Sequence, residues 1–101
     1  MLAGDEKILR RILHMHLSGT RGGPVRLKIL LMLEKKPHNI NELATKIPLD
    51  YKTVQHHIRV LHKSGFIIPS GKKYANSYSL AEIIRINKRL LKEINDMGKS
   101  K

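Results

Sequence analysis

The chain has 101 residues, enough for one small domain, and 20 Lys and Arg against 8 Asp and Glu give it a formal charge of +12 and a pI near 10.3. Such a balance favours a polyanionic partner, although it does not define a fold. The absence of cysteine excludes a disulfide framework and a thiolate metal site.

No apolar run approaches the roughly 18 residues of a membrane span. The start, MLAGDEK, lacks a basic region followed by an apolar one, so it does not resemble a signal peptide. We therefore expect a soluble, cytoplasmic protein with no membrane partner.

The first predicted element is an amphipathic helix over Asp5 to Leu17, because its apolar residues recur at spacings of one, three and four. The glycine-containing stretch 18–23 then predicts a change of direction. His14 and His16 lie two positions apart, and such side chains point in nearly opposite directions from a helix. They therefore do not predict a metal site.

A second helix is predicted from Pro24, whose fixed φ suits the first helical position. Val25 to Lys36 is nearly apolar on all sides, which indicates the central core helix, and Pro37 ends it. Residues 38–40 are expected to form a short extended link.

Two helices joined by a tight turn follow. Asn41 is expected to be the N-cap of a helix that reaches Ile47 and is stopped by Pro48. Asp50 is the expected N-cap of the next helix, which runs to Ser64, with Gly65 in the left-handed C-terminal position.

The two faces of the helix 50–64 differ in chemistry. One side is apolar through Val54, Ile58 and Leu61. The other side carries cations and hydrogen-bond donors: Lys52, His56, Arg59 and Lys63, flanked by Thr53 and Gln55. An ordinary solvated face is the alternative. Because no acid follows Asp50 in this second helix of a helix-turn-helix, we favour contact with nucleic acid in a major groove.

A β-hairpin is predicted after Gly65, with strands at 66–68 and 74–79 around a turn at 69–73. Its tip carries Lys72 and Lys73, which could lie along phosphates or in a minor groove. Two solvated turn lysines are the alternative interpretation.

The last predicted helix runs from Leu80 to Met97, because Ser79 and Glu82 match a capping box. Its apolar stripe could dock on the domain's own core or pair with a second copy. We expect a dimer, since the domain is small, with Asn87 able to fix the register. The expected interface residues are Ile83, Asn87, Leu90, Leu91 and Ile94.

The stretch NELATKIPLDYKTVQHHIRVLHKSGFI, followed by a hairpin that ends in Tyr78-Ser79-Leu80, resembles the winged helix-turn-helix of archaeal and bacterial transcription regulators. Within that group it most resembles the arsenical-resistance-repressor (ArsR-like) class. The resemblance covers about Pro24 to Leu80. The family pattern is matched by Asp50, His57, Ile58, Val60, Leu61, Gly65, Phe66 and Ile67.

This resemblance implies roles for individual residues. Lys52, Thr53, Gln55 and His56 match positions that touch bases, and Arg59 matches one used on the DNA backbone. We add Lys63, Lys72 and Lys73 to the backbone set on their charge and place. His57 matches a boundary residue that supports the helix. Many relatives sense metals through cysteines, or through His and acidic residues on the last helix, and this chain has neither pattern.

No enzyme is predicted, because the eight acids are scattered and no acid-base pair, phosphate loop or nucleophile motif appears. We expect no metal, no cofactor and no small-molecule ligand.

The predicted fold is mostly α with a small β-hairpin wing: one winged helix-turn-helix domain over 1–101, with a core at 24–80 and flanking helices at 5–17 and 80–97. The predicted function is that of a homodimeric transcription regulator that binds double-stranded DNA sequence-specifically. Two alternatives stay open: a nucleic-acid-binding module without strong sequence preference, and a protein-interaction subunit.

Overall fold

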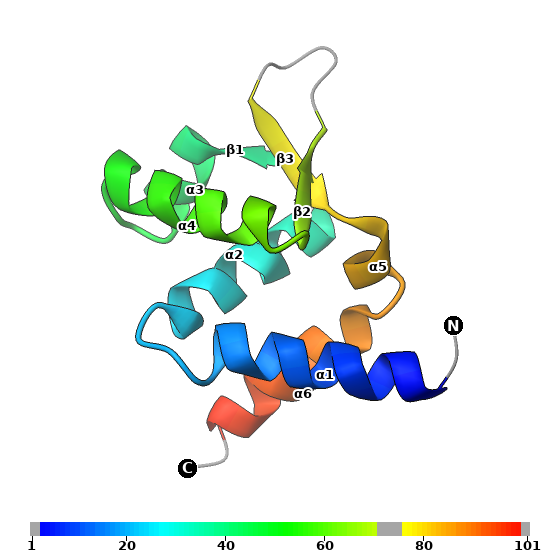
Figure 1. Cartoon of the computed structure of the whole chain (residues 1–101). Coiled ribbons are helices and arrows are strands. Elements are labelled where there is room, and N and C mark those ends of the chain that lie inside the picture. The colour runs from blue at the N-terminus through cyan, green and yellow to red at the C-terminus, as the bar shows by residue number, and fades with distance from the viewer. Residues whose placement is uncertain (1–2, 71–75, 100–101) are drawn as a thin grey trace.

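The computed structural model describes residues 3–70 and 76–99. In this part of the chain no helix is long and apolar enough to cross a membrane. The described residues are mostly helical and include a small antiparallel sheet, which confirms the predicted fold class. The elements in chain order (Figure 1) are α1 (Ala3–Leu17), α2 (Gly23–Lys35), β1 (His38–Asn39), α3 (Ile40–Lys46), α4 (Tyr51–Lys63), β2 (Ile67–Pro69), β3 (Ser77–Leu80), α5 (Glu82–Arg85) and α6 (Lys88–Lys99).

The sheet contains the predicted hairpin and one strand that was not predicted. Its strand order is β1-β3-β2, so β3 lies in the middle. Ile67 pairs with Leu80 in the hairpin, while His38 of β1 pairs with Tyr78 on the other edge. The hairpin tip, with Lys72 and Lys73, lies outside the described residues.

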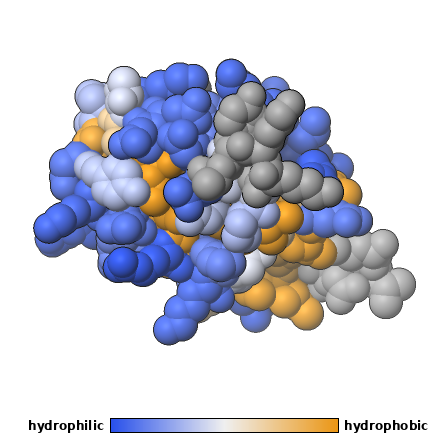
Figure 2. All heavy atoms as spheres, turned by 90° about the horizontal axis from the view of Figure 1, so that it is seen from above, coloured by the Kyte–Doolittle hydropathy of each residue, from blue (hydrophilic) through white to orange (hydrophobic). Residues whose placement is uncertain are grey.

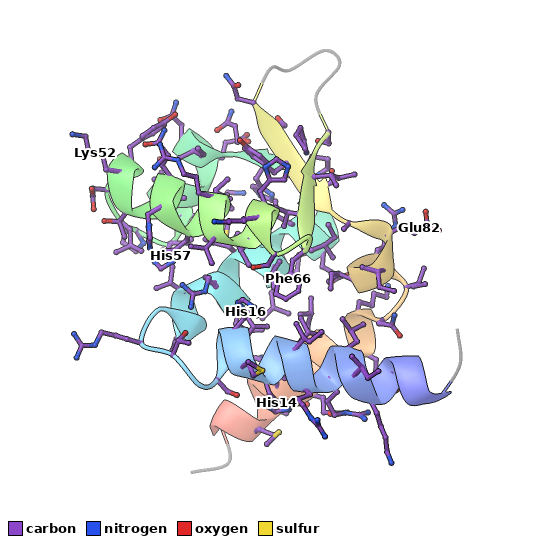
Figure 3. The ribbon with its side chains drawn as sticks, in the orientation of Figure 1. His14, His16, Lys52, His57, Phe66 and Glu82 are labelled. Carbon is purple, nitrogen blue, oxygen red and sulfur yellow. The ribbon has the colours of Figure 1, made fainter. Side chains whose placement is uncertain are left out.

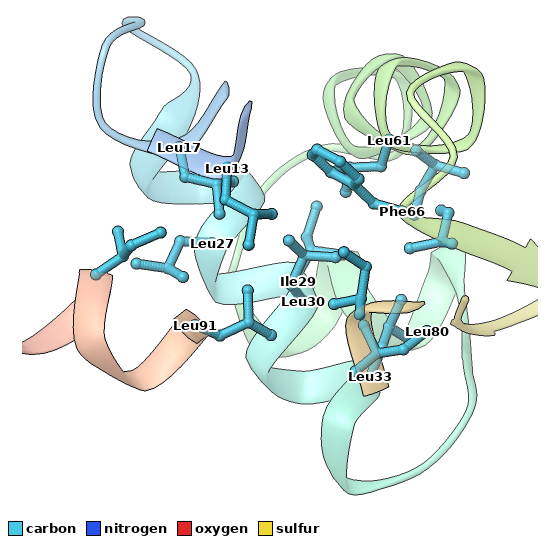
Figure 4. Packing of buried hydrophobic residues seen from close by; sticks show 14 of the residues in the cluster. Leu13, Leu17, Leu27, Ile29, Leu30, Leu33, Leu61, Phe66, Leu80 and Leu91 are labelled. Atoms are coloured by element: carbon cyan, nitrogen blue, oxygen red, sulfur yellow. The ribbon is translucent and has the colours of Figure 1, made fainter. Parts of the chain in front are cut away.

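The core forms around α2, which lies between two groups of elements. Figure 1 shows α1 and α6 on one side of it, and α3, α4 and the sheet on the other. Ile29 and Leu30 on α2 are fully buried, and Leu13 and Leu61 reach the same cluster from α1 and α4 (Figure 4). The near-continuous apolar character of α2 is explained by this position between two packed layers.

Ion pairs join α1 to α6. Arg10 Nε donates to Glu93 Oε2 at 2.8 Å, and Arg89 Nη2 donates to Glu6 Oε1 at 2.7 Å. The Glu93 carboxylate raises the pKa of the Arg10 guanidinium through this hydrogen bond and its charge. Glu6 and Glu93 thus form ion pairs at the end of the molecule that lies away from the helix-turn-helix.

The N-cap of α3 is Asn39, and the expectation of Asn41 was wrong. The Glu42 backbone N–H donates to Asn39 Oδ1 at 2.8 Å, and the Asn39 backbone N–H donates to Glu42 Oε1 at 2.8 Å. This reciprocal capping box satisfies two amides at the start of the helix, so α3 begins at Ile40.

The last helix is broken in two, contrary to the prediction of one helix from Leu80 to Met97. Ser79 lies in β3, and the N-cap of α5 is Ala81, which makes no side-chain capping bond. The break comes at Asn87, whose Nδ2 donates to the Ile83 carbonyl at 2.8 Å. A side chain that takes this carbonyl competes with the helical backbone bond, which ends α5 before α6 begins.

Three of the five residues expected at a dimer interface lie in the core of the single chain. Leu90, Leu91 and Ile94 are 1%, 0% and 4% exposed. The sequence left two uses open for this apolar stripe: docking on the chain's own core or pairing with a second copy. These three residues dock on the chain's own core. Ile83 is exposed and Asn87 half-buried, and the position of a dimer interface stays a prediction.

Candidate nucleic-acid interface

The start of α4 is fixed by Asp50, as predicted. The Thr53 backbone N–H donates to Asp50 Oδ2 at 3.3 Å, and the Thr53 hydroxyl donates to Oδ1. These bonds favour the ionised carboxylate and lower the pKa of Asp50, the hydroxyl having the largest effect. The carboxylate also complements the positive end of the helix.

The end of α4 is also as predicted. Gly65 has a φ of +81°, in the left-handed region that favours glycine. The chain therefore turns sharply after Ser64 and enters β2. A cap at one end and a glycine at the other fix the length of the helix.

The inner face of α4 is the apolar stripe predicted from the sequence. Val54, Ile58 and Leu61 are buried in the core cluster, where α4 packs against α2 and α3. This burial fixes the rotation of the helix about its own axis, and therefore which residues face outward.

The outer face of α4 carries the predicted cations and donors. Lys52, His56, Arg59 and Lys63 are exposed, and Thr53 and Gln55 are half-buried. Figure 3 shows Lys52 pointing away from the body of the molecule at the outer end of α4. The structure thus places all six residues on one accessible ridge of the helix, which we call the α4 ridge.

The cations of the α4 ridge have no acidic partner in the described part of the chain, since none of its ion pairs includes Lys52, Arg59 or Lys63. Ion pairs there include the carboxylates of Glu6, Glu34 and Glu93, on α1, α2 and α6. Figure 2 shows that the surface on the side of the wing consists largely of hydrophilic residues. Uncompensated charge on a convex ridge suits contact with a polyanion.

His57 lies on the inner edge of α4, in contact with Arg26. The two side chains are almost fully buried, and Arg26 Nη1 lies 3.3 Å from His57 Nδ1. An arginine can only donate, so Nδ1 of His57 must be the acceptor. Burial, the charge of Arg26 and the charge of His56 lower the pKa of His57, in that order of size. Figure 3 shows His57 turned toward α2, which supports its expected role as a helix support.

Arg26 joins three elements and was not recognised from the sequence. Its guanidinium donates to the His16 carbonyl at 3.2 and 3.4 Å, to the Thr20 hydroxyl, and to His57. Burial lowers the pKa of this guanidinium. The available signal was an arginine next to the apolar residues Val25 and Leu27, since a buried cation requires partners on neighbouring elements.

The close approach of α1 and α2 in this region depends on a glycine. A Cβ on Gly23 would overlap the Leu17 backbone. His16, from the same end of α1, contacts Phe66 edge-on, with ring centroids 5.2 Å apart (Figure 3). The junction of α4 with the wing is therefore packed directly against α1. Among the described residues, no group of three His, Cys, Asp or Glu could hold a metal ion.

The helix pair α3–α4, with its outward ridge and the β2–β3 wing, defines the winged helix-turn-helix class. Residues 23–68, from the start of α2 into β2, match the family described as "Bacterial regulatory protein, arsR family". The match supports DNA-binding regulation of transcription as the role of the chain, and the family is one of regulators and not of enzymes. No curated protein matches the sequence.

Solved structures of similar fold include three bacterial proteins. Reduced HlyU from Vibrio cholerae N16961 has a TM-score of 0.66 and 17% identity, over 93% of this chain and 97% of that one. The transcriptional regulator HlyU from Vibrio vulnificus CMCP6 has a TM-score of 0.65 and 22% identity, over 90% of each chain. The transcriptional repressor BigR from Xylella fastidiosa has a TM-score of 0.66 and 20% identity, over 97% of this chain and 90% of that one. At these identities the likeness is one of fold.

Proposed function

We propose that the protein is a homodimeric, cytoplasmic transcription regulator that binds double-stranded DNA sequence-specifically. In this proposal the α4 ridge enters a major groove, where Lys52, Thr53, Gln55 and His56 contact base edges. Arg59 and Lys63 bind the flanking phosphates, together with the wing lysines Lys72 and Lys73. The observation that carries the proposal is the α4 ridge itself, whose cations Lys52, Arg59 and Lys63 are exposed and form no ion pair among the described residues.

The proposed dimer places two such ridges in successive major grooves, roughly 34 Å apart. The outer face of α1 supports this part of the proposal. Ile8, Ile12 and Met15 are 60%, 38% and 62% exposed, and their spacing of four and three puts them on one side of the helix. An exposed apolar stripe of this kind is typical of a helix that pairs with another surface. We therefore assign α1 to the dimer interface.

Selection of preferred duplexes from a random pool, followed by competition, tests the proposal. A selected duplex should outcompete bulk DNA by at least about a thousandfold at fixed salt. Its sequence should be a pseudopalindrome with half-sites one helical turn apart. Binding without discrimination would favour a nucleic-acid module with no sequence preference. Absence of binding to any duplex would leave the protein-interaction alternative.

A further inference from the structure

A hollow of about 610 Å³ lies where the end of α1, the first turns of α2 and the end of α6 meet. Its volume falls within the range of small-molecule sites. The buried side chains of Leu17, Leu27 and Ile94 line it, and Figure 4 shows Leu17 and Leu27 facing one another from α1 and α2. This apolar lining would accept the hydrocarbon part of a ligand.

The polar groups around the hollow select the charge of its ligand. Lys28 and His14 line it, and none of its described lining residues is acidic. Lys28 is exposed and belongs to none of the ion pairs of the described residues. An ammonium beside an apolar lining suits a molecule with one carboxylate on an aliphatic or aromatic body.

One lining residue connects the hollow to the inner edge of α4. The Thr20 hydroxyl accepts a hydrogen bond from Arg26, whose other nitrogen donates to His57 on α4. A ligand that moves Thr20 therefore acts on the residue that holds α4 against α2. We propose that the hollow binds a small apolar monocarboxylate, and that its occupancy changes DNA affinity through Thr20, Arg26 and His57. The second half of this inference rests on the proposed function.

The first experiment tests the site without DNA. The purified protein is titrated with 4-phenylbutyrate, its uncharged amide and the matching amine, and the amide NMR signals of Leu27 and Ile94 are followed. The carboxylate should bind at least about tenfold more tightly than the amide, because only the carboxylate forms a charge-assisted contact.

Variants of the exposed lysines on α2 provide the matched comparison. Lys28→Met should lower phenylbutyrate affinity by about tenfold, and Lys35→Met, on the same helix outside the hollow, should leave it unchanged. Equal binding of carboxylate and amide, or no binding at millimolar concentration, would overturn the site. A phenylbutyrate affinity that falls as protein concentration rises would also overturn the site, because a second copy of the chain would then cover the hollow.

The second experiment tests the connection to DNA binding. Affinity for the selected duplex is measured with and without saturating phenylbutyrate, and the two affinities should differ by at least about fivefold. Thr20→Val should reduce this ratio to about one, and Thr20→Ser should restore it. A ratio that persists in Thr20→Val would refute the route through Arg26. If no duplex binds at all, the proposed function fails, while the titration without DNA still decides the site.

Discussion

Single residues fix the end of α4 and its attachment to α2. Gly65 ends α4 in a conformation that L-residues rarely adopt, and His57 attaches α4 to Arg26 on α2. Asp50 and Gly65 could be predicted, because capping and positive φ depend on local sequence. Arg26 could not, since its partners lie on α1, the α1–α2 turn and α4.

We expect Gly65→Ala to lower the free energy of unfolding by about 1 to 2 kcal/mol, because alanine is strained at a φ of +81°. No atom lies within 4 Å of the added Cβ, so the cost is conformational and not steric. Urea denaturation measures it. Gly98→Ala in α6 is the matched control and should be neutral or stabilising. An unchanged stability of Gly65→Ala would contradict the left-handed turn.

Stability should fall in acid partly because of His57. The pKa of His57 is lowered below its ordinary value of 6.5 by burial and by the charges of Arg26 and His56. The unfolded chain therefore binds this proton first, so the stabilisation is complete above about pH 6.5 and is lost as the pH falls toward the folded pKa. His57→Gln should flatten this part of the curve of unfolding free energy against pH. The same change at His62, an exposed histidine of α4, is the control. Identical curves for His57→Gln and the wild type would refute the buried contact.

At the scale of whole elements, a helix or strand could be predicted where its signals lie within its own stretch of sequence. The α4 helix needs only its own cap, stripe and glycine, and its predicted bounds of 50–64 agree with Tyr51–Lys63 and its two capping residues. β1 is two residues long and exists through pairing with Ser77 and Tyr78, far along the chain. The break at Asn87 depends on a side chain that bonds its own helix backbone, which a stripe of apolar spacing does not reveal.

The lysines of the α4 ridge are expected to affect DNA binding through phosphate contacts. Lys63→Ala removes a phosphate contact, so it should weaken all duplexes alike and reduce the slope of log affinity against log salt by about one unit. Fluorescence anisotropy at several salt concentrations measures this slope. Lys35→Ala on α2 is the control with the same change of charge. If Lys63→Ala altered sequence preference and left the slope intact, Lys63 would contact bases instead.

Across the whole molecule, paired and unpaired charges are separated. Ion pairs occupy the α1–α6 end, and the unpaired cations of α4 lie on the opposite side of α2 (Figure 1). The sequence predicted one domain with flanking helices, but the dimer stripe could not be located, since burial of Leu90 and Leu91 depends on how α6 docks. The exposed stripe of α1 is the better candidate.

Ile12→Glu should convert the proposed dimer to a monomer, because it places a charge in the middle of the α1 stripe. Sedimentation velocity gives the mass directly. Ile68→Glu, at another exposed apolar position, is the control and should leave the mass unchanged. A dimer that persists in Ile12→Glu would place the interface elsewhere.

Base recognition by the α4 ridge is tested most directly by affinity of Gln55→Ala for the selected duplex and for all its single-base variants. The account predicts a loss of about 1 to 3 kcal/mol on the selected duplex, with discrimination relaxed at one base position and unchanged at the others. His56→Ala should behave in the same way at a different position. Unchanged affinity and unchanged discrimination in Gln55→Ala would show that this face of α4 does not read DNA sequence.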